Sequence, residues 1–180
     1  FYRKLGYAEL APFPVVARYI GNTRGPVAAR LPALAPIAGA ADAALRLGLA
    51  RTRATAARAA RRGGARIVPV ESFGPWADAL WESLRDRLGT TTLRDRRFLQ
   101  WRYLEGPHRY ALLGLERDGQ LQGFAAVSVR PWKGGRAAEL MELMAAPGDH
   151  DGARLLVAES VLHAAREGAV ALRTWVGGRH

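Results

Sequence analysis

The chain has 180 residues, of which 49% are hydrophobic and 24% are charged, as in an ordinary globular protein. It contains no cysteine, which excludes disulfides and thiolate metal sites and fits a cytoplasmic location. No stretch reaches the roughly 20 uncharged apolar residues that a membrane span needs.

The first third of the chain is expected to contain short strands followed by a helix. Residues 1–20 contain short strand-like pieces interrupted by Pro12 and Pro14, a pattern that favours the edge of a sheet. Residues 37–62 are rich in Ala, Leu and Arg and predict a helix. We therefore interpret residues 21–65 as a basic linker that contains a helix.

The net charge of +11 is concentrated in residues 21–66, where nine Arg stand against one Asp. Such a block is typical of proteins that bind nucleic acid, an acidic surface or an acidic partner. No aromatic residue occurs between Tyr19 and Phe73, whereas single-strand nucleic-acid binders add stacking aromatics to a basic groove. The sequence therefore favours a solvated helix and argues against nucleic acid as a partner.

Residues 66–180 predict one domain with the order β-α-α-β-β-β-α-β. Pro75 suits the first turn of a helix, and Asp95 is a plausible N-cap for the next one. Asp118-Gly119 between two apolar runs predicts a hairpin. The predicted strands are 66–70, 110–116, 121–129, 137–146 and 169–176, and the predicted helices begin near 75, 95 and 152.

This element order resembles the fold of the GNAT (GCN5-related N-acetyltransferase) family. FYRKLGY at 1–7 resembles the closing motif of that family, an aromatic-Tyr-x-x-x-Gly-aromatic stretch. The segment RRFLQWRYLEGPHRYALLGLERDG at 96–119 looks like the second domain of some bacterial tandem proteins of this kind. The resemblance implies an α/β fold with a mixed, mostly antiparallel sheet flanked by helices.

The resemblance also implies a domain organisation. Residues 1–20 would be the last strands of a first GNAT-like domain, 21–65 the linker, and 66–180 a second domain that is incomplete at its C-terminus. The chain would then be a fragment of a tandem protein, and the other half of that protein would be one of its partners.

The activity implied by the resemblance is transfer of an acetyl or longer acyl group from acyl-CoA to an amine. Such a transfer needs a base, donors for the oxyanion and an acid. Tyr2 stands at the Tyr of the closing motif and is the candidate acid. Glu139 and Glu142, on the third meander strand, are the candidate bases, which strand alternation would place on opposite faces. The alternative for both is a surface carboxylate.

The candidate cofactor loop is PGDHDGARLL, residues 147–156. The family pattern is Arg/Gln-x-x-Gly-x-Gly/Ala, but Pro147 stands at its first position and His150 at its earlier glycine. Asp149 and Asp151 bring negative charge toward a diphosphate, which is repulsive. We interpret them as part of a polar loop with a helix-capping Asp, not as a metal site. The candidate acetyl-CoA-binding residues are Ala145, Ala146, Gly148, Gly152 and Ala153.

These departures favour a second domain that has lost acetyl-CoA binding. Two other functions stay open. One is a non-catalytic binding or structural module, and the other is a binder of nucleic acid or of an acidic surface built on residues 21–66.

Overall fold

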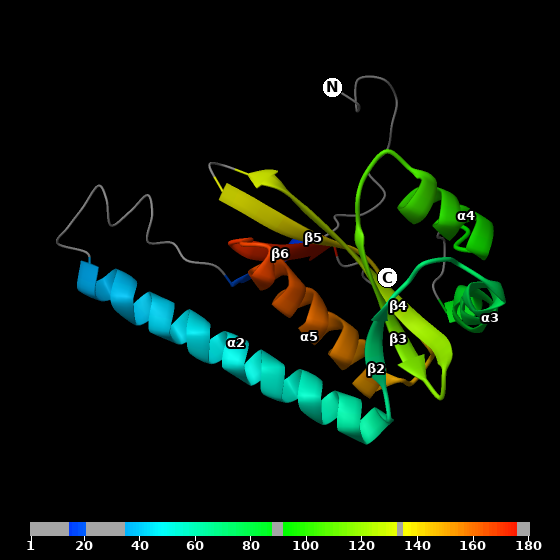
Figure 1. Ribbon diagram of the computed structural model, residues 1–180, viewed down its shortest axis with the longest axis horizontal. Coiled ribbons are helices and arrows are strands. Elements are labelled where there is room, and N and C mark those ends of the chain that lie inside the picture. Colours follow the sequence, from blue (N-terminus) through cyan, green and yellow to red (C-terminus); the bar gives the residue numbers. More distant parts are fainter. Residues whose placement is uncertain (1–14, 21–34, 88–91, 133–134, 176–180) are drawn as a thin grey trace.

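The computed structural model describes residues 15–20, 35–87, 92–132 and 135–175. They form a six-stranded sheet in the order β1-β6-β5-β4-β3-β2, with helices on both of its faces (Figure 1). The strands are β1 (Val15–Tyr19), β2 (Arg66–Pro69), β3 (Ala111–Arg117), β4 (Gln120–Trp132), β5 (Gly135–Ala145) and β6 (Ala171–Trp175). The helices are α2 (Ala35–Gly63), α3 (Pro75–Leu84), α4 (Arg96–Gln100) and α5 (His150–Arg166), with short turns η3 (Arg85–Arg87) and η4 (Trp101–Glu105).

The predicted order of elements from β2 to β6 is confirmed. β2, β3, β4 and β5 form an antiparallel meander, and α5 then crosses over so that β6 lies parallel to β5. Asp118 and Gly119 have φ of 49° and 75°, the positive values that a tight two-residue hairpin between β3 and β4 requires. The sheet is therefore mixed and mostly antiparallel.

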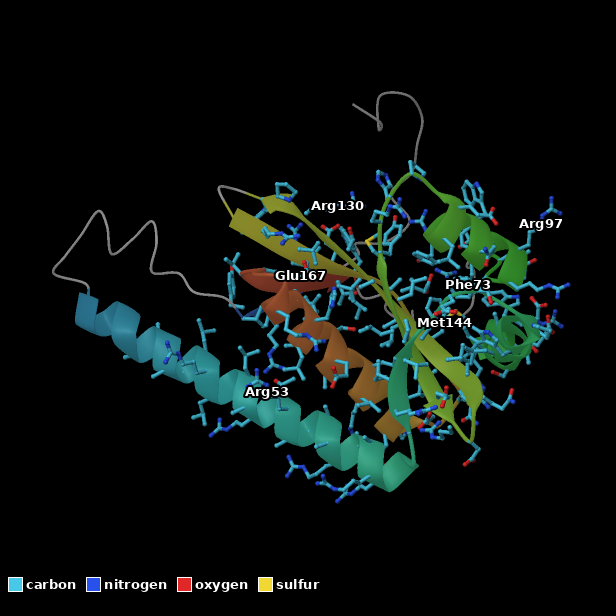
Figure 2. All side chains as sticks on the ribbon, in the orientation of Figure 1. Arg53, Phe73, Arg97, Arg130, Met144 and Glu167 are labelled. Atoms are coloured by element: carbon cyan, nitrogen blue, oxygen red, sulfur yellow. The ribbon has the colours of Figure 1, made fainter. Side chains whose placement is uncertain are left out.

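Two separate apolar clusters lie on the two faces of the sheet. Leu115, Val127 and Leu156 belong to the cluster beneath α5, and Ala56 and Ala59 of α2 extend it. The second cluster fills the space between the sheet and α3 and α4, where Figure 2 shows Phe73 and Met144. Each helix layer is therefore anchored by its own core.

The N-terminal elements take part in this architecture. α2 runs beside α5, and its Thr52, Ala56 and Ala59 are buried (Figure 1). β1 pairs antiparallel with β6 and forms one edge of the sheet, as the prolines before it predict. The assignment of residues 1–20 to a preceding domain and of 21–65 to a linker stays a prediction. In the structure, β1 belongs to the same sheet as the later strands, and α2 belongs to the same helix layer as α5.

The side chain of Trp101 does not pack against the sheet. It is 59% exposed and contacts Phe98, whereas Leu99 and Tyr103 point into the core. Leu99 and Tyr103 are four residues apart and share a helix face, so a residue halfway between them points away. Within the described residues, no helix is long and apolar enough to cross a membrane.

Candidate functional site

Glu139 and Glu142 lie on the same face of the sheet, so the prediction of opposite faces is wrong. Val127 of β4 pairs with Leu140 and its neighbour Ala126 pairs with Glu142, which leaves Met141 as an extra residue in β5. Such a bulge breaks the strict alternation of side chains along a strand. Both carboxylates therefore point toward the face that carries α3 and α4.

Glu142 is held by two side chains from the helical layer. Arg94 Nε lies 3.0 Å from each carboxylate oxygen, and the Tyr103 hydroxyl donates a hydrogen bond to Oε2 over 3.2 Å. Burial and the nearby charge of Glu142 raise the pKa of Tyr103, so this hydroxyl keeps its proton and remains a donor. The carboxylate oxygens of Glu142, which a general base would use to accept a proton, therefore already accept hydrogen bonds from Arg94 and Tyr103.

Glu139 lies at the end of the ladder between β5 and β6. The parallel pairing between these strands ends at Glu139 and Arg173, and beyond it the Thr174 hydroxyl donates to the Leu140 carbonyl over 3.1 Å. Arg173 Nη2 donates to Glu139 over 2.6 Å, and its guanidinium lies 5.4 Å from the centre of the Trp132 ring. Among the described residues, Arg173 Nε is buried and has no hydrogen-bond partner, so an acceptor group of a ligand or a water could satisfy this donor.

The loop between β5 and α5 is closed by the carboxylate of Asp149. Asp149 is the N-cap of α5, and its Oδ1 accepts a hydrogen bond from the Gly152 amide over 2.9 Å. The interpretation of the loop as one with a helix-capping Asp is therefore confirmed, and the capping residue is Asp149. Gly148 precedes it with φ of 81°, and the Ala153 amide donates to the Asp149 carbonyl over 3.0 Å.

Arg117 joins this loop to two other elements, and we call the resulting contacts the Arg117 clasp. Its Nη1 and Nη2 donate to the two oxygens of Asp149 over 2.8 and 2.9 Å, a bidentate ion pair. Its Nε donates to the Gly63 carbonyl at the end of α2 over 2.6 Å. The clasp therefore connects β3, the C-terminus of α2 and the N-terminus of α5.

Gly152 fits this arrangement because it has no side chain. A Cβ at this position would collide with the Asp149 carboxylate and would lie 2.6 Å from Leu115 Cδ2. The glycine therefore allows the first turn of α5 to approach both the cap and the sheet. Among the described residues, no three His, Asp or Glu side chains lie close enough together to hold a metal ion.

Comparison with known proteins gives matches among solved structures alone. No protein-family model and no curated protein matches the sequence. One similar structure is a GCN5-related glucosamine N-acetyltransferase region of a fungal multi-domain β-N-acetylglucosaminidase, with 18% identity, a TM-score of 0.49, and coverage of 63% of this chain and 14% of that one. The chain thus spans far less than two thirds of that protein.

Two further similar structures come from bacterial and metagenomic sources. An integron cassette protein of V. cholerae has 14% identity and a TM-score of 0.48, with coverage of 63% of this chain and 76% of that one. An aminoglycoside acetyltransferase from an uncultured soil metagenomic sample has 11% identity and a TM-score of 0.45, with coverage of 64% and 78%.

The fold is GNAT-like. Two helices follow β2, a meander of β3, β4 and β5 comes next, and α5 leads to the parallel strand β6, which is the order that the sequence predicts. In this GNAT-like domain the five predicted cofactor residues do lie together, at the end of β5 and the start of α5. Tyr2, the predicted acid, lies outside the described residues.

The loop does not fit the diphosphate of acetyl-CoA. A diphosphate at a helix N-terminus needs free backbone N–H groups and a favourable charge. Here the Gly152 amide already donates to a carboxylate, and Arg117 is already neutralised by the same group. Asp149 thus occupies the position of an anion, and a second anion would be repelled by it.

Sequence reasoning missed four side chains of the site: Arg94, Tyr103 as a partner of Glu142, Arg117 and Arg173. The sequence pattern does not mark the three arginines, because each one pairs with a carboxylate on an element that is distant in the sequence.

Substitution of Asp149 by asparagine is expected to reduce stability in a pH-dependent way. Burial raises the pKa of Asp149, but the hydrogen bonds from Arg117 and the Gly152 amide outweigh it, so the pKa lies below its usual value. A carboxyl group whose pKa is lower in the folded state adds stability above its unfolded pKa, and this stability is lost as the pH falls through the folded value. We expect the difference in unfolding free energy between wild type and Asp149→Asn to be constant near pH 7 and to shrink below about pH 4.

Urea unfolding between pH 7 and pH 3 measures this difference. Asp86→Asn is a suitable control because the Asp86 side chain is 89% exposed. A difference for Asp149→Asn that does not change over this range would show that the carboxylate charge has no role in the clasp.

Proposed function

We propose that this GNAT-like domain serves an acyl-CoA-dependent N-acyltransferase as a non-catalytic domain. It would shape the amine-acceptor cleft or the domain interface, while the other half of a tandem protein would bind acyl-CoA and carry the chemistry. The observation that supports this proposal is the Asp149 carboxylate, which fills the N-terminus of α5 and is neutralised by Arg117.

The second candidate function is acyl transfer to an amine by this domain itself. Its support is the position of Glu142 and Glu139 on one sheet face, with Glu139 at the end of the ladder between β5 and β6. Glu142 or Glu139 would then remove a proton from the amine. Each of them would first have to leave its ion pair with Arg94 or Arg173.

Titration of acetyl-CoA into the ¹⁵N-labelled chain, followed by two-dimensional NMR, separates the two functions. We expect the amide signals of Ala145, Ala146 and Gly148 to stay unchanged at millimolar acetyl-CoA, because Asp149 closes the loop beside them. Dispersed signals from the rest of the domain provide the control for folding.

Saturable shifts of these three amides that disappear in a Gly152→Val variant would contradict the non-catalytic proposal. The catalytic function also predicts that the CoA thiol is released when an amine is present. This release should be lost in the Glu142→Gln variant. The chain contains no cysteine, so a thiol reagent reports the released CoA alone.

A further inference from the structure

A surface pocket of about 450 Å³ lies between α2 and α5, away from the sheet face that carries Glu139 and Glu142. Three arginines from three different elements line it, namely Arg18 of β1, Arg51 of α2 and Arg154 of α5. His150, Thr52 and Thr55 add further polar groups. The pocket is large enough for a small organic ligand.

The positive charge of this pocket is poorly compensated. Arg18 donates to Thr52 Oγ1 over 2.7 Å and to the Gly48 carbonyl over 3.2 Å, two neutral acceptors that orient its guanidinium without cancelling its charge. No carboxylate of the described residues forms an ion pair with Arg51. Arg154 pairs with Asp151 over 3.3 Å, but its side chain is 64% exposed, so this ion pair is weakened by solvent.

The other wall of the pocket is apolar. Ala153, Ala158 and Val157 of α5 contribute to it, and Val157 is 38% exposed although it is a large hydrophobic residue. Guanidinium groups bind phosphate through paired N–H donors, and the apolar wall could cover a carbon-containing part of the same ligand. The combination fits a molecule that is anionic at one end.

The arrangement of the charges favours a compact ligand over a polymer. Arginines from three elements line one hollow. A nucleic-acid backbone, in contrast, is followed by cations spread along a surface. α2 does carry other exposed arginines, such as Arg53, which Figure 2 labels. They are not among the residues that line the pocket.

We propose that the pocket between α2 and α5 binds a small phosphate-bearing molecule through Arg18, Arg51 and Arg154. The pocket adjoins the loop that Asp149 closes, since His150 and Ala153 line it, but its three arginines are distinct from the Arg117 clasp. The proposal does not depend on whether the domain is catalytic. It also gives α2 a role beyond that of a connector, because α2 supplies Arg51 and both threonines.

The test uses inorganic pyrophosphate as the probe and isothermal titration calorimetry with the whole chain at moderate salt. We expect saturable binding by wild type and weakening by at least about tenfold in Arg51→Glu, which removes a charge-assisted contact. Arg53→Glu is the matched control because it makes the same charge change on the same helix outside the pocket. This control is expected to weaken binding by less than about threefold, since only screened long-range attraction is lost.

Three results would overturn the proposal. The first is a folded wild-type chain that does not bind pyrophosphate. The second is an equal loss of affinity in Arg51→Glu and Arg53→Glu. This result would show that the total charge of α2, and not the pocket, attracts pyrophosphate. The third is a single-stranded oligonucleotide that binds more tightly than pyrophosphate and is weakened equally by both substitutions, which would indicate a nucleic-acid surface.

Discussion

Replacement of Asp149 by alanine is expected to lower the free energy of unfolding by about 2–4 kcal/mol and to create a new anion site. The substitution removes the N-cap of α5 and leaves Arg117 without its carboxylate. Both side chains of this pair are less than one fifth exposed, at 16% and 17%, so water compensates little for the lost contact. The freed Gly152 amide and the Arg117 guanidinium would then be available to a phosphate group.

Thermal unfolding with and without pyrophosphate measures both effects. The variant is made in an Arg51→Glu background, so that the pocket between α2 and α5 does not contribute. We expect pyrophosphate to restore part of the lost stability, and we expect a further Arg117→Met substitution to abolish this gain. A stability loss without any gain in anion binding would show that Asp149 does not stand in the place of an anion.

Asp151→Ala is the control for the stability effect. Asp151 lies two residues further along the same turn and makes a single contact of 3.3 Å with a largely exposed Arg154. An exposed pair of this kind contributes less than about 1 kcal/mol. A similar cost for Asp149→Ala and Asp151→Ala would therefore contradict the importance of the clasp.

Phe124→Ala is expected to cost about 3–5 kcal/mol, the largest effect of a single truncation in the domain. The Phe124 side chain is fully buried at the centre of an aromatic cluster. Its ring centre lies 5.0 Å from that of Phe73, 6.1 Å from that of Trp76 and 6.1 Å from that of Tyr103. The cavity left by alanine would open between the sheet and the α3–α4 layer.

Urea unfolding followed by circular dichroism measures this loss. Trp101→Ala is the control, because this larger ring is 59% exposed and should cost less than about 1 kcal/mol. Phe124→Ala should also loosen the contact of Tyr103 with Glu142, since Tyr103 packs against Phe124. Equal costs for the two substitutions would show that the cluster is not the core of this face.

The course of the chain through the sheet is largely predictable from local patterns. Asp118-Gly119 specifies a turn through the positive φ values that it tolerates, and apolar runs on both sides of it specify the strands. α5 begins at His150, two residues before the predicted start at Gly152, because Asp149 supplies the cap. Local signals of this kind act within a few residues, so they can be read from one sequence.

The geometry of the candidate site is less predictable, because it depends on contacts between distant residues. Nothing in the sequence around Met141 marks a bulge, yet this one extra residue decides that Glu139 and Glu142 share a face. Asp149 looked repulsive to a diphosphate, but its partner Arg117 belongs to β3 and could not be identified from spacing. The same holds for Arg94, which reaches Glu142 from the segment before α4.

The pairing of β1 with β6 has a consequence for synthesis of the protein. β1 leaves the ribosome first among the described strands and β6 last. β1 therefore has no strand to pair with until β6 has been synthesised. At the usual speed of translation, the interval between the synthesis of β1 and that of β6 is on the order of ten seconds. During that time the exposed Val15, Val16 and Tyr19 present a free strand edge to other nascent chains. Closure of this edge of the sheet is therefore a late event, and a chaperone that shields β1 should raise the yield of folded protein.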